Sequence, residues 1–316
     1  MKRTALSQAI VTQVMVVEGN TIIASQSNGN IYIFGSVYEQ PMILENDRGI
    51  WALAASKTIL VSGDIAGKLR IWDIKTGLCI DTFKGHTAAI RAIHLLNDST
   101  VITTSKDNTL RHWNVRTGSC IRVFTGHEKG VHCSAIHGDV LVSGSYDNTA
   151  RVWNISDGKC FAVLKGHQGP VYAVVFDGTF LATASIDSTI RVWDPNSGAC
   201  EAVLESHSDL VGLLVLRGGQ LVSGAAGGDV CVWSVKNLAL IHRFSAHAGV
   251  IKSLVVDDRT IVSGGADGVK IWDLADGTLL KHLNAEGTVD ALAISGKKVI
   301  SCARIGDDAF IDVNGL

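Results

Sequence analysis

The chain has 316 residues, of which 47% are hydrophobic and 18% are charged, and its formal net charge is −2. This apolar content is sufficient for a continuous core and excludes a disordered protein. The small net charge excludes a whole-molecule field that would attract nucleic acid, and no stretch approaches the roughly 20 apolar residues of a membrane span.

A short pattern that ends in Trp recurs along the chain. It first appears in degenerate form as ASQSNGNIYIFG, with Phe34 at the Trp position, and then as VSGDIAGKLRIW, which ends at Trp72. The copies that follow are ITTSKDNTLRHW, VSGSYDNTARVW, ATASIDSTIRVW, VSGAAGGDVCVW and VSGGADGVKIW. The last copy is SCARIGDDAFIDV, with Ile311 at the Trp position. From Trp72 to Trp272 the spacings are 41, 40, 40, 40 and 39 residues. A constant period of this size indicates stacked structural units, here eight, which we interpret as one domain over residues 1–316.

The fourth copy shows what one unit builds. Apolar runs rich in Val and Ile cover residues 130–136, 139–145, 149–155 and 159–165, and the turn sequences HGD, YDN and SDG separate them. Each unit is therefore predicted to be four antiparallel strands. Because one such sheet buries too little surface alone, the units are predicted to be blades around an axis. The predicted fold is all-β, an eight-bladed β-propeller.

The ends of the chain indicate how the propeller closes. The last copy ends at DDAFIDVNGL without a fourth strand, whereas KRTALSQ precedes the first inner strand. We predict that this N-terminal segment supplies the outer strand of the eighth blade.

Polar residues recur at fixed offsets within the repeat: a His before the inner strand, then Ser or Thr, then Asp, then Trp. These groups can form a hydrogen-bonded chain that satisfies buried polar atoms. The complete sets are His86, Thr103, Asp107 and Trp113; His127, Ser143, Asp147 and Trp153; His167, Thr183, Asp187 and Trp193; and His247, Ser263, Asp267 and Trp272. A catalytic triad uses the same residue types, but a trio repeated in four blades indicates a scaffold.

Besides the degenerate first and last copies, two blades depart from this pattern. The sixth has Gly227 at the Asp position, and the second has Ala66 there and no His. We expect these blades to be less stable. The chain has no nucleophile elbow, no phosphate-binding GK[ST] loop and no Cys or His at zinc spacing. We therefore expect no enzyme, no metal and no cofactor.

Four cysteines, Cys79, Cys120, Cys160 and Cys200, each follow a repeat Trp by seven residues. The repeat holds equivalent positions apart, which argues against disulfides. We interpret these cysteines as buried thiols in a reducing compartment, in a soluble protein of the nucleus or cytoplasm.

The pattern GH-x3-[IV]-x followed by LVSGS-x-D-x-T-x-RVW-[DN] resembles the WD-repeat propellers over nearly the whole chain. This resemblance implies a rigid, non-catalytic platform for protein or peptide binding. The segments VHCSAIHGDVLVSGSYDNT, IDSTIRVWD and HSDLVGLLVLRGGQLVSGAA are similar to the propeller of the F-box/WD-repeat substrate receptors of SCF ubiquitin ligases, of the fungal cell-division-control type. That second resemblance implies eight blades that bind phosphorylated degrons, typically phosphothreonine followed by proline. In that family the phosphate is bound by arginines at two positions of the repeat. One position follows GH-x3-[IV], and the other is the x of S-x-D.

Both positions are also expected from the fold to lie near the central channel on one face. In blades two to five they carry Arg91, Lys106, His132, Trp51, Tyr146 and Tyr172. Cations suit a phosphate, and aromatic rings suit an apolar or prolyl side chain. By resemblance, Arg91 occupies the place of a phosphate-binding arginine, and Trp51 and Tyr146 occupy those of pocket aromatics. Lys106 and His132 replace two further arginines.

Asp290 stands where the family has a Trp, and we expect its charge to repel phosphate.

Two functions remain open. The first is a substrate receptor that binds phosphorylated Ser/Thr peptides for an SCF-type ligase, with ligase components as partners if the full gene product carries the F-box that we do not find in this chain. The second is a WD-repeat scaffold for an unphosphorylated protein partner. Neither function involves nucleic acid or a membrane.

Overall fold

The computed structural model describes residues 2–17, 21–35, 40–283 and 287–316. Within these ranges every regular element is a β-strand, and no helix there has the length and hydropathy needed to cross a membrane. The strands form eight separate four-stranded sheets. The predicted all-β fold, with eight blades of four antiparallel strands, is confirmed.

The chain divides into two compact units, and the first comprises Met1–Gly126 and Asp290–Leu316. Blade 1 contains β2 (Val11–Val17), β3 (Thr21–Gln26), β4 (Asn30–Phe34) and β5 (Met42–Glu45). Blade 2 contains β6 (Ile50–Ala55), β7 (Ile59–Asp64), β8 (Leu69–Asp73) and β9 (Cys79–Phe83). Blade 3 contains β10 (Ile90–Asn97), β11 (Thr100–Ser105), β12 (Leu110–Asn114) and β13 (Cys120–Phe124). Blade 8 contains β30 (Thr288–Ser295), β31 (Lys298–Ile305), β32 (Asp308–Gly315) and β1 (Lys2–Ala5).

The second unit is His127–Val289. Blade 4 contains β14 (Val131–His137), β15 (Val140–Ser145), β16 (Ala150–Asn154) and β17 (Cys160–Leu164). Blade 5 contains β18 (Val171–Phe176), β19 (Leu181–Ser185), β20 (Thr189–Trp193) and β21 (Cys200–Glu205). Blade 6 contains β22 (Val211–Arg217), β23 (Gln220–Ala225), β24 (Asp229–Ser234) and β25 (Ala239–Ser245). Blade 7 contains β26 (Ser253–Val256), β27 (Thr260–Gly265), β28 (Gly268–Asp273) and β29 (Leu279–Leu283).

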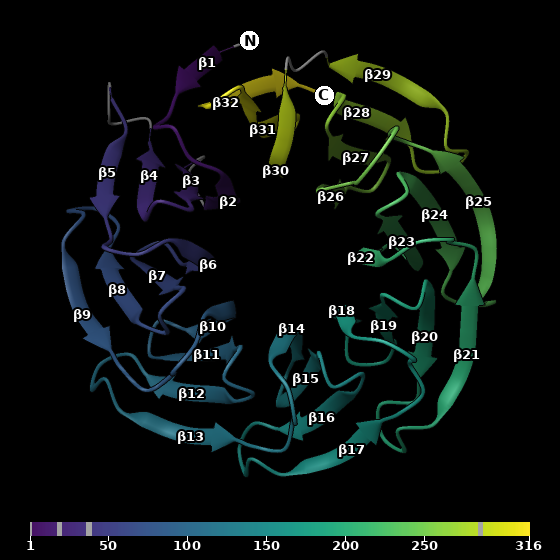
Figure 1. The fold of residues 1–316 in the computed structure, drawn as a ribbon, viewed down its shortest axis with the longest axis horizontal. Coiled ribbons are helices and arrows are strands. Elements are labelled where there is room, and N and C mark those ends of the chain that lie inside the picture. The colour runs from purple at the N-terminus through teal and green to yellow at the C-terminus, as the bar shows by residue number, and fades with distance from the viewer. Residues whose placement is uncertain (1, 18–20, 36–39, 284–286) are drawn as a thin grey trace. The chain divides into compact units, whose positions relative to one another are not determined.

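The N-terminal strand completes blade 8, as predicted. Strand β1 pairs antiparallel with β32, so that the strand order of this sheet is β1-β32-β31-β30. Arg3 lies opposite Asp312, and its guanidinium donates to both carboxylate oxygens of Asp312, at 2.9 and 3.0 Å. Two segments from opposite ends of the sequence are thereby held in one sheet of the first unit (Figure 1).

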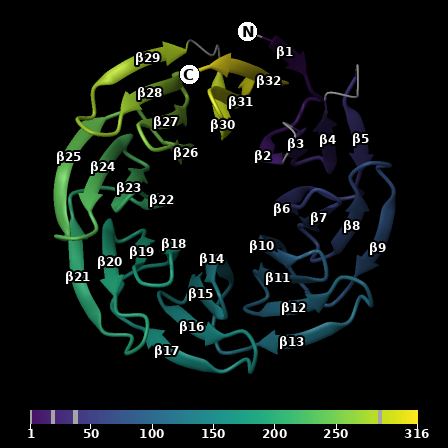
Figure 2. The ribbon, with the colours of Figure 1, turned by 180° about the vertical axis from the view of Figure 1, so that it is seen from behind.

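The core lies between successive blades of a unit. In the second unit the first strands of the blades, β14, β18, β22 and β26, follow one another side by side, as both views show (Figures 1 and 2). One apolar cluster joins blades 5 and 6 and includes Ile190 and Trp233; another joins blades 2 and 3 and includes Ile71 and Trp113. The second strand of a blade, such as β19, is buried along its whole length, because other blades cover both faces of its sheet.

The outer strands differ because they form the edges of the sheets. Along β17 the side chains alternate between buried and accessible, and Phe161 is 46% exposed. The repeat cysteines begin these outer strands, and this position corrects the prediction that they are buried: Cys79 and Cys200 are exposed, whereas Cys120 and Cys160 are half-buried. The outermost strand of a blade has a neighbouring strand on one side only, so residues at its start are accessible to solvent.

Candidate functional site

The predicted peptide-binding residues occupy a special place in the strand ladders. In β10, Ile90 pairs with Ser105 and Ala92 pairs with Thr104, so Arg91 is the extra residue of a β-bulge. The residues at the equivalent position of blades 2, 4 and 5 are also the extra residues of bulges: Trp51, His132 and Tyr172. A bulge leaves one residue outside the regular ladder and redirects its side chain. The repeat therefore sets one redirected side chain at the start of each of these inner strands.

In the first unit, Arg91 and Trp51 come from neighbouring blades and contact each other. The guanidinium carbon of Arg91 lies 4.4 Å from the centroid of the Trp51 indole, within the range of a cation–π interaction. Trp51 is 44% exposed, so part of the indole remains open to solvent. The stacking holds the planar guanidinium in one orientation and restricts the geometries in which it can bind a ligand.

Lys106 follows β11 in the same sheet as Arg91. Its backbone N–H donates to the carbonyl oxygen of Ala89, at 2.9 Å, and its side chain is exposed. Because Ser105 pairs with Ile90, Lys106 and Arg91 lie at the same end of neighbouring strands. Blade 3 thus presents two cations at one end, one stacked on an indole and one exposed to solvent.

The other three predicted residues belong to the second unit and form a cluster of their own. The ring centroid of His132 lies 5.2 Å from that of Tyr146 and 4.7 Å from that of Tyr172, and the two tyrosine rings are 5.8 Å apart. The Tyr146 hydroxyl is hydrogen-bonded to Nδ1 of His132 at 3.0 Å. All three side chains are partly exposed. The Tyr146 ring packs edge to face with both other rings, and the His132 and Tyr172 rings are tilted relative to each other. Edge-to-face pairs are favourable, so this cluster is an apolar surface with polar tips.

Asp290 has a partner that the sequence analysis missed. In blade 8 the residue equivalent to Lys106 is Arg304, whose Nε and Nη2 atoms donate to the Asp290 carboxylate at 2.5 and 3.2 Å. The Asp290 side chain is only 4% exposed. The guanidinium thus offsets the charge of the carboxylate within the same blade, and the expected repulsion of phosphate by Asp290 stays a prediction. Continuing the count of repeat positions into blade 8 would have identified Arg304.

The His, hydroxyl, Asp and Trp sets are each brought together within one blade. In blade 4, His127 Nδ1 lies 2.7 Å from Asp147 Oδ2, and its Nε2 lies 2.8 Å from Ser143 Oγ. The indole N–H of Trp153 donates to the same Ser143 oxygen at 2.9 Å. The sets in blades 3, 5 and 7 have the same connections. Ser143 is fully buried, so its hydroxyl cannot reach a substrate as a nucleophile would.

The carboxylates of these sets are held in their charged form. Burial raises the pKa of Asp147, but hydrogen bonds from His127 and Thr149 outweigh burial and hold that pKa below its ordinary value. Burial likewise raises the pKa of Asp187, and hydrogen bonds that include those from Thr189 and His167 lower it to about 2. In blades 3, 4 and 5 the carboxylate accepts from the His and from a backbone N–H of the following turn, which fixes both. In blade 7 the Asp267 carboxylate accepts from His247 and from the Lys270 ammonium.

In blade 2, other residues make the missing connections. Asn46 is buried at the His position and donates from Nδ2 to the carbonyl oxygen of Gly29, at 3.1 Å. Asp64 is fully buried and accepts from the backbone N–H groups of Ala66 and Lys68, both at 2.9 Å. The turn that Ala66 cannot hold is therefore held by a carboxylate two residues earlier.

In blade 6 the histidine has no hydrogen-bonded carboxylate among the residues that the structure describes. His207 Nε2 lies 2.7 Å from Ser223 Oγ, whereas its Nδ1 lies 3.9 Å from the Cys231 sulfur. A Cβ atom at Gly227 would lie 2.5 Å from Asp209 Oδ2, so the Asp209 carboxylate fills the space that the usual Asp would occupy. Burial and the nearby Arg243 lower the pKa of His207 to about 4.

No group of three or more His, Cys, Asp or Glu side chains suited to a metal ion occurs in the part of the chain that the structure describes. The family profile for the WD domain, G-beta repeat, matches residues 77–114, 118–154 and 158–194, which lie in blades 2 to 5. These three segments of the chain are thus similar to WD repeats. WD-repeat propellers are typically non-catalytic and bind protein partners, so protein interaction is the function that this fold implies.

The chain is similar to several curated proteins over part of its length. Cell division control protein 4 of Saccharomyces cerevisiae is 34% identical over 82 residues, which are 25% of this chain and 10% of that protein. WD repeat-containing protein pop2 of Schizosaccharomyces pombe is 28% identical over 90 residues, 28% of this chain and 13% of that protein. The matches therefore span only about a tenth of these relatives. Among solved structures, the computationally designed Ika8 protein has a TM-score of 0.90 and 28% identity, over 98% of this chain and 97% of that one.

Proposed function

We propose that the protein binds phosphorylated Ser/Thr peptides, as the substrate receptor part of an SCF-type ubiquitin ligase. The observation that carries the proposal is the Arg91 guanidinium stacked on Trp51, 4.4 Å from its ring centroid, at the start of two neighbouring inner strands. Lys106 adds a second, exposed cation at the same end of blade 3.

The chemistry of this group suits a phosphate monoester. A guanidinium presents two parallel N–H donors to the oxygens of a phosphate, and a lysine adds charge without directional preference. The exposed part of the Trp51 indole offers an apolar surface beside the cations, which suits a prolyl ring that follows the phosphorylated residue. The His132, Tyr146 and Tyr172 cluster of the second unit is a separate candidate contact for apolar side chains.

The similarity to Cell division control protein 4 supports the same assignment over 82 residues. That stretch covers a quarter of this chain, so the ligase context is a proposal that needs its own test. We expect the full gene product to co-purify from cells with the adaptor and cullin subunits of an SCF ligase. Absence of those subunits from the purified complex would count against the ligase context and leave peptide binding to be tested independently.

Peptide binding is tested by fluorescence anisotropy with a Thr-Pro peptide library in phosphorylated and unphosphorylated forms. We expect the phosphorylated peptides to bind more tightly and Arg91→Ala to lose at least tenfold in affinity, because a charge-assisted hydrogen bond contributes about 1.5–3 kcal/mol. Arg91→Lys should recover part of the loss, since it keeps the charge but not the two-pronged geometry. Arg116→Ala is the matched control, since Arg116 is an exposed arginine in the turn between β12 and β13, at the other end of blade 3.

Three results would decide against phosphate recognition. They are equal binding of both peptide forms, an equal loss in the two alanine variants, and binding that does not weaken with added salt. Binding that survives phosphatase treatment would instead favour the second candidate, a scaffold for an unphosphorylated partner.

A further inference from the structure

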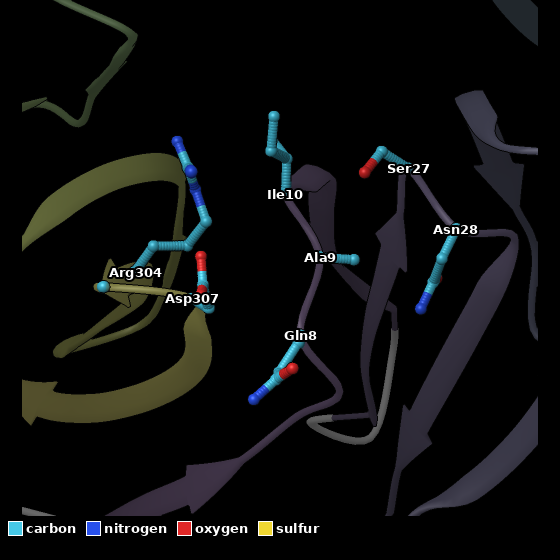
Figure 3. A pocket seen from close by; sticks show the side chains of 8 residues that line it. Gln8, Ala9, Ile10, Ser27, Asn28, Arg304 and Asp307 are labelled. Carbon is cyan, nitrogen blue, oxygen red and sulfur yellow. The ribbon is translucent and has the colours of Figure 1, made fainter.

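A surface pocket of about 400 Å³ lies in the first unit, away from Arg91 and Trp51 in the sequence. The connection between β1 and β2, the turn between β3 and β4, and the turn between β31 and β32 form its walls (Figure 3). Figure 3 shows Arg304 and Asp307 on one side and Ser27 on the other, with Ile10 between them. Segments from both ends of the chain therefore build one cavity.

The charges around the pocket do not balance. The Arg304 guanidinium is bound to Asp290 by two hydrogen bonds, so these two charges cancel. Asp307 is exposed and makes no hydrogen bond or ion pair with any other residue in the described ranges. Asp308 is also exposed and accepts from the neutral amide of Gln8 at 3.1 Å. The pocket is therefore negative even though an arginine lines it.

The uncharged part of the lining has two kinds of surface. Ile10 is 45% exposed and offers an aliphatic wall. Gln8 donates through its Nε2 atom to Asp308, which leaves its Oε1 atom as an acceptor. The Ser27 hydroxyl is a further polar group of the lining. Acceptors and a carboxylate beside an aliphatic wall match a side chain with an apolar stem and a cationic head.

We propose that this pocket binds a lysine or arginine side chain of a protein partner. The aliphatic stem of that side chain packs against Ile10, and its cationic head donates to the Asp307 carboxylate and to the side-chain Oε1 of Gln8. Asp307 would repel a phosphate or carboxylate in this pocket. Arg304 would not compensate for that repulsion, because its positive charge is already paired with Asp290. This site is distinct from the Arg91 and Trp51 pair and does not depend on phosphate recognition there.

The test uses amide chemical-shift mapping on the full chain, labelled with ¹⁵N and ²H. The probe is the capped pentapeptide Ala-Ala-Lys-Ala-Ala, and its comparison has norleucine, which keeps the stem and lacks the amine, in place of lysine. We expect the lysine peptide to shift the amides of residues 8–10, 27–28 and 305–308, and the norleucine peptide to shift them much less. Asp307→Asn should weaken lysine-peptide binding about two- to fivefold, the range for an exposed ion pair.

Asp308→Asn is the matched control, because it removes the same charge from the next residue while keeping an oxygen that can accept from Gln8. Thermal melting of both variants checks that each is folded. The proposal is overturned if the lysine peptide leaves these amides unshifted, if norleucine shifts them equally, or if both variants lose affinity to the same extent. Because the peptide contains no phosphate, none of these results bears on the phosphopeptide proposal.

Discussion

Acid should destabilise this protein through His207 in particular. The sequence places Gly227 where the four complete sets have Asp, so His207 is bonded to Ser223 at 2.7 Å but has no hydrogen-bonded carboxylate in the described part of the chain. Burial and Arg243 lower its pKa to about 4, whereas an unfolded histidine has a pKa of about 6.5. Between these two values the unfolded chain binds a proton that the folded chain does not bind. The free energy of unfolding therefore falls as the pH drops through this window.

The size of the effect follows from the two pKa values. Linkage with a folded pKa of about 4 and an unfolded pKa of about 6.5 gives a loss of about 2 kcal/mol between pH 7 and pH 5. Other groups also titrate in this range, so the measurement needs a variant that removes only this contribution. His207→Asn is suitable, because Asn46 already occupies the equivalent position in blade 2.

The assay is urea unfolding of the wild type and of His207→Asn at pH 7 and pH 5. The variant should be less stable at pH 7, but its loss between the two pH values should be about 2 kcal/mol smaller than that of the wild type. His137→Asn, which changes an exposed histidine at the end of β14, should keep the wild-type difference between the two pH values. If wild type and His207→Asn lose the same free energy between pH 7 and pH 5, His207 is not a buried neutral histidine and the reasoning is wrong.

Three further predictions concern the scaffold. Asp147→Ala should lower the free energy of unfolding by roughly 2–4 kcal/mol in urea, because it leaves the buried His127 without its carboxylate. Asp267→Ala should lower it less, since the Asp267 carboxylate is 36% exposed. Equal losses in the two variants would contradict this argument. Deletion of residues 1–8 removes β1 and with it Arg3, the partner of the buried Asp312. The melting temperature should fall clearly, and unchanged cooperative melting would refute closure by β1. A maleimide should label the exposed Cys79 and Cys200 in the native protein. Cys231 and Cys302 should react only in denaturant, because burial raises the pKa of both thiols, that of Cys231 to about 12. Mass spectrometry after a short labelling pulse distinguishes the two pairs.

The period of the repeat made most of the fold predictable. One Trp in about 40 residues gave the number of blades, and the turn sequences within one copy gave its four strands. The missing fourth strand after Ile311 predicted the pairing of β1 with β32. These features depend on spacing along the chain, which a sequence shows directly.

Contacts between different repeat positions were not predictable in the same way. The pairing of Asp290 with Arg304 depends on which side chains meet across β30 and β31, and the exposure of Cys200 depends on its place at a sheet edge. The replacement of the usual turn carboxylate by Asp64 was missed because that residue lies two positions from the expected place. In each case the physical effect comes from a neighbour in space that the repeat pattern does not specify.

The bulges at the start of the inner strands separate two kinds of sequence change. The residues on either side of Arg91, Ile90 and Ala92, pair within the ladder, whereas Arg91 itself is left out of it. Trp51, His132 and Tyr172 occupy the same kind of position and have quite different chemistry. We expect a substitution there to change the chemistry of the surface while the paired strands and the buried hydrogen bonds stay intact. A repeat of this kind can thus vary at one surface position without disturbing the pairing that holds the blade together.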